Sequence, residues 1–173
     1  MTIHPGHPFA DPHPDPVRRF RGRLGSGVTL WTSGPADARA GLTVSSLMVA
    51  GGEPGRVLAL LGPDADLTAR LEQTGRAVVQ MLSWHHRRLA EAFAGTTPAP
   101  GGPFRTGDFT DTAAGPLLTD ATASADVTLE DVRDVGWSRL VTCILDEVTL
   151  GDDVDPLLHR RGRWVRTRPR VEH

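Results

Sequence analysis

Small hydroxyl-bearing residues gather in one stretch of the chain, where an apolar run ends. Apolar and small residues alternate through residues 41–45 with the two-residue period of a β-strand. The hydroxyl side chains of Thr43, Ser45 and Ser46 fall at and just beyond its end. Short side chains let backbone N–H groups approach a ligand, and amides together with hydroxyls can hold a phosphate. The same residues also suit an ordinary turn, so both interpretations stay open here.

Other residue types capable of chemistry form no convincing set. His85 and His86 are adjacent, so we expect them to point in different directions from a helix rather than to share a metal ion. Three more histidines stand among prolines in residues 1–14, without a cysteine or a convergent carboxylate to complete a metal site. Ser45 and Ser46 lack the flanking glycines of a hydrolase nucleophile, and no glycine-rich nucleotide fingerprint occurs. We nominate no catalytic acid, base or metal ligand.

Length and composition fit one globular domain. The chain has 173 residues, 39% of them hydrophobic, which is enough for one core. Nineteen basic residues, all arginine, stand against 21 acidic ones, so the net charge of -2 offers no overall field for nucleic acid or an anionic membrane. The single cysteine, Cys143, excludes an intramolecular disulfide. No signal peptide or membrane span is recognised, and we expect a cytoplasmic protein.

The rest of the pattern predicts strands with a few short helices. Asp15 and Pro16 are typical of a helix start, and Ser83 is placed to begin a helix that carries the two histidines. Another helix is expected to be capped by Asp66 and to end at Gly75. Strands are predicted at about 28–32, 41–47, 57–61, 77–82, 121–129 and 137–150, with a turn at 130–136. Without alternating βαβ crossovers, this order favours an antiparallel barrel.

The two ends of the chain differ in composition from its centre. Residues 1–14 combine histidines and prolines and are expected to form a loose tail. Residues 15–166 form the predicted domain, and residues 167–173 a short C-terminal tail. Within the domain, residues 96–112 are rich in Gly, Pro and Thr, which is typical of a lid or a linker.

Several short motifs occur in a set order along the chain. The order is Thr43-Val44-Ser45-Ser46, Glu53-Pro54 before an apolar strand, Ala92-Phe93-Ala94-Gly95, Gly115-Pro116, and Pro156-Leu157 followed by His159, Gly162 and Trp164. This ordered set resembles the flavin reductase-like, FMN-binding split β-barrel family, over roughly residues 15–166. The resemblance implies a mainly β fold, an antiparallel split barrel of Greek-key type.

The same resemblance implies a cofactor, a reaction and partners. FMN, or FAD in its place, would be reduced by NAD(P)H, and members of such families can supply reduced flavin to a monooxygenase. The protein would be a homodimer. The residues implied to contact flavin are Thr43, Val44, Ser45 and Ser46 at the phosphate and ribityl chain, Ala50, Gly51 and Gly52 at the isoalloxazine, Gln80 in a strand, and His159, Arg163 and Trp164 in the terminal segment.

This chain departs from the family pattern at three positions. Many members have Gly-Asp-His near the nicotinamide, where this chain has Gly136-Trp137-Ser138. A serine often found after the bend is Gly51, and a frequent asparagine is Gln80. Two alternatives therefore stay open. The chain could bind or store flavin without NAD(P)H turnover, or carry another split-barrel activity, such as an oxidase or a deazaflavin-dependent reductase.

Overall fold

The computed structural model describes residues 15–167, so the predicted tails lie outside the described residues except for Thr167. Its helices are α1 (Pro16–Arg23), α2 (Asp66–Thr74) and α3 (Arg87–Phe93), with 3-10 turns η1 (Trp84–His86) and η2 (Pro103–Thr106). The strands are β1 (Ser26–Gly27), β2 (Thr29–Ser33), β3 (Ala40–Val44), β4 (Leu47–Ala50), β5 (Arg56–Leu61), β6 (Arg76–Met81), β7 (Phe109–Asp111), β8 (Pro116–Leu118), β9 (Ala123–Val135), β10 (Ser138–Leu150), β11 (Leu157–Arg160) and β12 (Arg163–Arg166).

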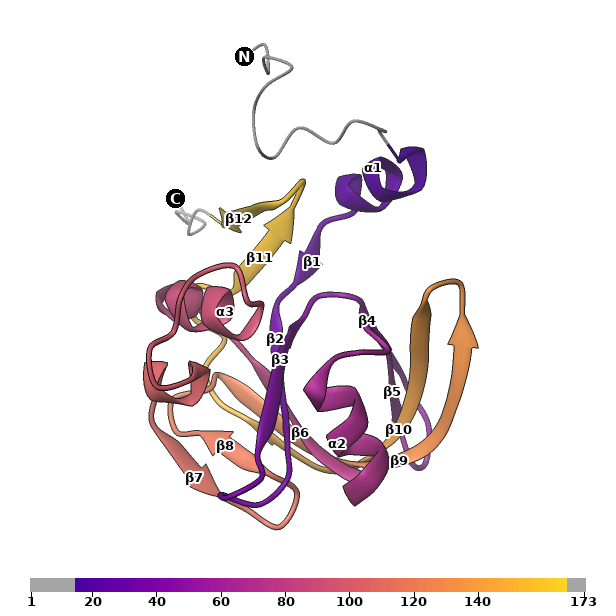
Figure 1. Cartoon of the computed structure of the whole chain (residues 1–173), viewed down its shortest axis with the longest axis vertical. Coiled ribbons are helices and arrows are strands. Elements are labelled where there is room, and N and C mark those ends of the chain that lie inside the picture. Colours follow the sequence, from indigo (N-terminus) through magenta and orange to yellow (C-terminus); the bar gives the residue numbers. More distant parts are fainter. Residues whose placement is uncertain (1–14, 168–173) are drawn as a thin grey trace, which may run out of the picture.

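Seven strands form one curled sheet in the order β3-β2-β6-β9-β10-β5-β4, and every pairing in it is antiparallel (Figure 1). The two edge strands, β3 and β4, are consecutive in the chain and joined only by Ser45 and Ser46. So short a connection brings the two edges of the sheet together, and the sheet closes on itself except at the seam between β3 and β4. The predicted antiparallel split barrel is confirmed.

Two apolar clusters hold this barrel together. One fills its interior and receives α2; its members include Trp31, Leu61, Leu67, Leu71 and Val127, all at most 1% exposed. The other packs α3 against the outside of the barrel. Its members include Leu30, Leu89, Phe93, Leu118 and Leu157. Burying each such side chain is worth about 1.5–3 kcal/mol, so the two clusters fix α2 and α3 on the sheet.

The helix ends follow from local chemistry. The Asp15 carboxylate accepts a hydrogen bond from the Val17 N–H at 2.9 Å, which confirms the predicted start of α1. In α2 the cap position is Ala65, so the prediction that Asp66 caps this helix is wrong by one residue. Asp66 lies instead in the first turn, where its charge favours the helix dipole. Gly75 ends α2 with a φ of 69°, as expected.

The longest hairpin corrects another prediction. Residues 130–136 are not a turn, because β9 continues to Val135 and only Gly136 and Trp137 connect it to β10. The acidic residues in this stretch are exposed, whereas Val132 packs against the core. Acidic side chains on the solvent face are compatible with strand pairing, and the polar composition alone was misleading.

The N-terminal helix and the terminal hairpin form a separate arm. Strands β1, β11 and β12 make a small sheet, and the Arg161 N–H donates to the Gly22 carbonyl at 2.7 Å. Figure 1 shows α1 with β11 and β12 beyond one end of the barrel. The arm joins the barrel through hydrogen bonds of Leu157 with Val28 and Leu82.

Candidate functional site

The seam between β3 and β4 carries unpaired hydrogen-bond donors. Within residues 15–167, the backbone N–H groups of Ser45 and Ser46 donate no hydrogen bond, and the Ser45 hydroxyl makes none. Both residues are half-buried. Two successive free amides beside a free hydroxyl are donors of the kind that can hold a phosphate. The donor set therefore fits the tail of a phosphorylated cofactor.

Two other hydroxyls predicted for this site are already engaged. The Thr43 hydroxyl donates to the Ala90 carbonyl in α3, and the Ser46 hydroxyl donates to the Leu60 carbonyl in β5, each at 2.7 Å. The Val44 side chain is 3% exposed and belongs to the interior cluster, which leaves only its backbone near the seam. Thr43 and Ser46 thus position the seam, and Ser45 is the hydroxyl available to a ligand.

Helix α3 connects the seam to the terminal hairpin. Ala90 accepts the hydrogen bond from Thr43, and the next residue, Glu91, accepts one from the Trp164 indole N–H at 2.9 Å. The Trp164 and His159 rings meet edge to face, with centroids 5.3 Å apart. The structure therefore brings Thr43, Trp164 and His159 around one helix, although more than 110 residues of sequence separate the first from the others.

His159 lies on the rim of a small hollow in the arm. The hollow measures about 320 Å³, and Gly27, Leu158, His159 and Val165 line it. Burial lowers the pKa of His159 below its ordinary value, so the imidazole is neutral near pH 7. Arg163 is exposed on the same hairpin. This hairpin therefore offers one cationic side chain, Arg163, and two rings, His159 and Trp164. None of the three contacts the seam.

The remaining predicted residues lie elsewhere. Ala50, Gly51 and Gly52 are exposed at the far end of β4, roughly 15 Å from Ser46 at about 3.3 Å per residue. Gln80 is completely buried, where its amide donates to Thr32 and Pro116 and accepts from the Leu118 N–H. The Gln80 side chain thus ties β6 to β8 and keeps no polar atom for a ligand, so we leave it out of the site.

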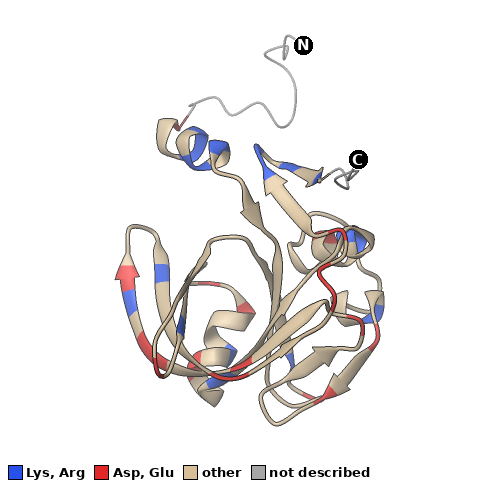
Figure 2. Ribbon diagram, turned by 180° about the vertical axis from the view of Figure 1, so that it is seen from behind, with Lys and Arg blue, Asp and Glu red and all other residues tan. Residues whose placement is uncertain are grey.

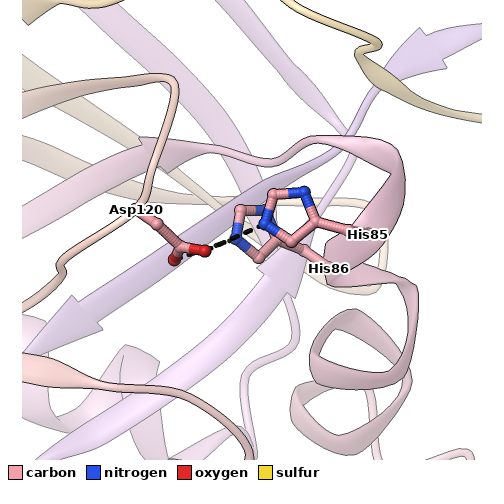
Figure 3. A group of neighbouring side chains, drawn as sticks. All are labelled: His85, His86 and Asp120. Carbon is pink, nitrogen blue, oxygen red and sulfur yellow. Dashed lines mark hydrogen bonds and ion pairs between the residues drawn. The ribbon is translucent and has the colours of Figure 1, made fainter.

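A cluster that the sequence did not reveal stands at the start of α3. Figure 3 shows His85 and His86 pointing toward Asp120, which precedes β9. The His85 Nε2 atom lies 2.9 Å from Asp120 Oδ2, and the His86 Nε2 atom lies 3.0 Å from Oδ1. The two ring centroids are 3.8 Å apart. The expectation that these histidines point in different directions is wrong, because Ser83 contacts the Nδ1 atoms of both rings and so turns both Nε2 atoms toward the Asp120 carboxylate.

Hydrogen bonds fix the protons of this cluster. The Ser83 N–H donates to His86 Nδ1 at 3.0 Å, and an amide can only donate, so neutral His86 carries its proton on Nε2, facing Asp120. A metal ion on Nε2 would force that proton onto Nδ1, against the Ser83 amide. The Ser83 hydroxyl lies 2.6 Å from His85 Nδ1 but is 3% exposed, too buried to attack a substrate. The cluster therefore fits a structural network better than a metal or hydrolytic centre.

The charges of the cluster follow from burial and contact. Burial lowers the pKa of His86, and the neighbouring Asp120 only partly offsets this. Burial alone would raise the pKa of Asp120, but hydrogen bonds from His85 and His86 outweigh it and hold this pKa below its ordinary value. At neutral pH the cluster contains an ionised carboxylate that is hydrogen-bonded to His85 and lies 3.0 Å from His86 Nε2.

A family model matches most of this sequence. The model described as "Flavin reductase like domain" matches residues 21–168. The chain belongs to the flavin reductase-like family. The resemblance seen in the sequence motifs is thereby confirmed.

Several relatives of this flavin reductase-like chain have named activities. An FMN reductase (NADH) RutF from Pantoea ananatis is 29% identical over 148 residues, which cover 85% of this chain and 77% of the relative. The reductase component of 4-hydroxyphenylacetate 3-monooxygenase from Pseudomonas aeruginosa is 23% identical, over 86% and 89% of the two chains. The NADH:FAD oxidoreductase SgcE6 of Streptomyces globisporus, solved with NAD and FAD fragments, shares the fold with a TM-score of 0.81, 24% identity and coverage of 90% and 93%.

Proposed function

We propose that this flavin reductase-like chain is an NAD(P)H-dependent flavin reductase that binds FMN at the seam between β3 and β4. The observation that carries the proposal is the pair of free amides at Ser45 and Ser46, in a chain matched by the family model over residues 21–168. The names of the relatives, FMN reductase (NADH) among them, support the same activity.

The residues of the seam would bind and orient the cofactor. The N–H groups of Ser45 and Ser46 and the Ser45 hydroxyl would donate to phosphate oxygens, while Thr43 holds the strand end against α3. Bound flavin supplies the redox chemistry, by accepting a hydride from the reduced nicotinamide. The protein then contributes alignment of the two rings and exclusion of water, and no side chain is required as an acid or base.

The terminal hairpin would contribute a second part of the site. We place His159, Arg163 and Trp164 near the flavin, where an arginine can offset phosphate or reduced-flavin charge. The bend at Ala50, Gly51 and Gly52 would meet the other end of the cofactor along β4. FMN is the preferred cofactor in this proposal, and FAD is the alternative, since relatives are named for each.

The proposal extends to the partners of the reaction. We expect a homodimer, because Met48 and Leu60 lie at neighbouring positions of β4 and β5 with 67% and 39% of their surface exposed. Reduced flavin would pass to a monooxygenase, as the name of the Pseudomonas aeruginosa relative indicates for that protein.

Among residues 15–167 no helix is long and apolar enough to cross a membrane. The buried Cys143 thiol suits the cytoplasmic location that we expect.

A simple assay tests this function. The purified chain, mixed with FMN and NADH or NADPH in air, should oxidise the nucleotide, which is followed by loss of nicotinamide absorbance. Oxidation of neither nucleotide, with FMN or FAD, would contradict the proposal. Tight flavin binding with no turnover would favour the storage alternative. That alternative stays open because Gly136-Trp137-Ser138 has no histidine where many family members have Gly-Asp-His.

A further inference from the structure

His86 is a buried titratable side chain that the proposed redox chemistry does not use. It is 5% exposed and lies where η1 meets α3, and its Nδ1 atom accepts a hydrogen bond from the Ser83 N–H at 3.0 Å. On the other side of the ring, Nε2 lies 3.0 Å from Asp120 Oδ1 (Figure 3). Ser83 is itself only 3% exposed, so its amide depends on the imidazole as acceptor. The His86 side chain therefore closes the turn that begins at Ser83.

The turn that His86 closes leads directly into α3, and α3 touches both parts of the proposed flavin site. The Ala90 carbonyl accepts from the Thr43 hydroxyl at the seam, and the Glu91 carboxylate accepts from the Trp164 indole in the terminal hairpin. Helix α3 has seven residues, a length that is not stable in isolation. Its position therefore depends on its apolar contacts and on what holds its first turn.

The same turn also holds the start of the terminal hairpin. The Trp84 N–H donates to the Asp155 carbonyl at 2.8 Å, and Ser83 forms an isolated β-bridge with Pro156. Pro156 directly precedes β11, whose first residue donates to the Leu82 carbonyl at 2.9 Å. A displacement of η1 is therefore transmitted to β11 as well as to α3.

A charged His86 is incompatible with this hydrogen-bond arrangement. Neutral His86 accepts at Nδ1 because its proton is on Nε2, whereas an imidazolium carries a proton on each nitrogen. The added proton would face the Ser83 N–H, and this buried amide would lose its acceptor. The Ser83 hydroxyl lies 3.2 Å from His86 Nδ1, but it is already 2.6 Å from His85 Nδ1. Protonation of His86 must therefore rearrange the turn.

The groups that face His86 keep it neutral at pH 7. Burial lowers the pKa of His86 from its ordinary value of 6.5, the Asp120 carboxylate opposes this, and the charge of His85 adds to the lowering. Because the folded-state pKa lies below the unfolded-state value, the hydrogen bond from Ser83 is fully available above about pH 6.5. It is lost as pH falls through the lower folded-state pKa.

The other charged groups around the turn have partners of their own. Helix α3 carries both basic and acidic positions (Figure 2). The Arg87 guanidinium lies 4.1 Å from the centroid of the Trp84 ring, and Glu91 is engaged by the indole of the terminal hairpin. Arg166 of β12 pairs with the Asp155 carboxylate at 2.7 Å. Asp120 and His85 are therefore the charged groups that decide when His86 is protonated.

We propose that His86 is a positioning residue of the flavin site, and that its neutral imidazole holds η1 and α3 in the arrangement that binds flavin. Acidification that protonates His86 rearranges the turn, so the seam and the terminal hairpin lose their common anchor and flavin affinity falls. His86 acts through Ser83 and α3 and takes no part in the redox chemistry. This inference rests on the proposed function and adds a pH dependence to it.

FMN titration by flavin fluorescence, from about pH 7.5 to about pH 5, tests the proposal. If FMN binds only the form with neutral His86, the dissociation constant of the wild type rises by up to about tenfold for each pH unit below the pKa of His86. In His86→Asn, an amide oxygen can accept from the Ser83 N–H and does not titrate, so this rise should be absent. The FMN phosphate itself titrates near about pH 6, but equally for every variant, so the comparison between variants removes its effect.

Two further variants separate the hydrogen bond from the mere presence of a histidine. His85→Asn makes the same change at the adjacent, exposed histidine, leaves the bond from Ser83 to His86 in place, and should keep the acid weakening. His86→Ala has no acceptor and should weaken FMN binding already at about pH 7.5. Circular dichroism checks that each variant folds.

NMR of the flavin-free wild type tests the linkage without any variant. The His86 ring, the Ser83 amide and the Trp164 indole N–H should titrate with one midpoint, because the turn and α3 connect them. A His86 that stays neutral until the chain unfolds, or that titrates without moving the other two signals, would overturn the positioning role. FMN binding with the same pH dependence in wild type and His86→Asn would also overturn it, and would leave the proposed function standing. A linked titration in a chain that binds no flavin at any pH would instead contradict the proposed function, and with it the role of His86 toward flavin.

Discussion

At the scale of single residues, the hydroxyl side chains near the seam have different tasks. Thr43 and Ser46 donate to main-chain carbonyls of α3 and β5, so they fix the shape of the seam. Ser45 has no partner among residues 15–167 and is therefore the side chain available for a phosphate. Residue type alone could not distinguish them, because all three have the same chemistry.

Replacement of Ser45 by alanine should weaken FMN binding without loss of stability. A hydrogen bond to a charged group is worth roughly 1.5–3 kcal/mol, so the dissociation constant should rise by about tenfold or more. Flavin fluorescence titration measures it, with urea unfolding as the check on stability. The matched variant Ser46→Ala should lower the free energy of unfolding by about 1 kcal/mol instead. Equal FMN affinity in wild type and Ser45→Ala would remove Ser45 from the site.

The variant Asp120→Asn should reduce stability in a pH-dependent way. Because the folded-state pKa of Asp120 is lowered, its ionised form contributes stability above the unfolded-state pKa of about 4. That contribution is lost as pH falls through the lower folded-state pKa. With Asp120 largely exposed, we expect a deficit of about 0.5–1.5 kcal/mol at pH 7. Urea unfolding at several pH values should show the deficit shrinking below about pH 4, and a constant deficit would contradict this explanation.

At the scale of elements, the hairpin of β9 and β10 contains an unfavourable pair. Glu147 stands directly opposite Asp126, and Asp146 is adjacent in sequence. Burial raises the pKa of Asp126, and the charges of Glu147 and Asp146 raise it further, while Arg76 opposes the shift. Like charges directly opposite on paired strands are destabilising, so this hairpin depends on its apolar core contacts for its stability.

Neutralising one member of this pair should relieve the repulsion between the two carboxylates. The variant Glu147→Gln should lower the pKa of Asp126 toward its ordinary value, since one repelling charge is gone. Stability should rise by a few tenths of a kcal/mol above the Asp126 pKa and should be unchanged well below it. Carboxyl NMR titration follows the pKa, and Glu53→Gln, an exposed residue beyond the β4 end, is the control. An Asp126 pKa unaffected by Glu147→Gln would show that burial alone raises it.

At the scale of the whole molecule, binding at the seam should stabilise the fold. The seam joins the two edges of the barrel, so a ligand that binds only the folded state is linked to global unfolding. FMN at about 100 times its dissociation constant should raise the free energy of unfolding by about 2.7 kcal/mol. Thermal unfolding with and without FMN measures this, with riboflavin as the phosphate-free comparison. Equal stabilisation by FMN and riboflavin would contradict a phosphate site at the seam.

The sequence by itself determined strands β2, β3, β5, β6, β9 and β10, most helix ends and the family, because these depend on short-range periodicity, caps and motif order. It located the hydroxyl-rich strand end, but it did not show that the Gln80 amide is used within the fold, and it extended a turn over residues 130–136 and separated His85 from His86. Only the tertiary structure decided these points. Hydrogen-bond partners such as Ala90, Leu118 and Asp120 lie 35 or more residues from the side chains they engage, and no local pattern records which donors the fold uses and which it leaves free.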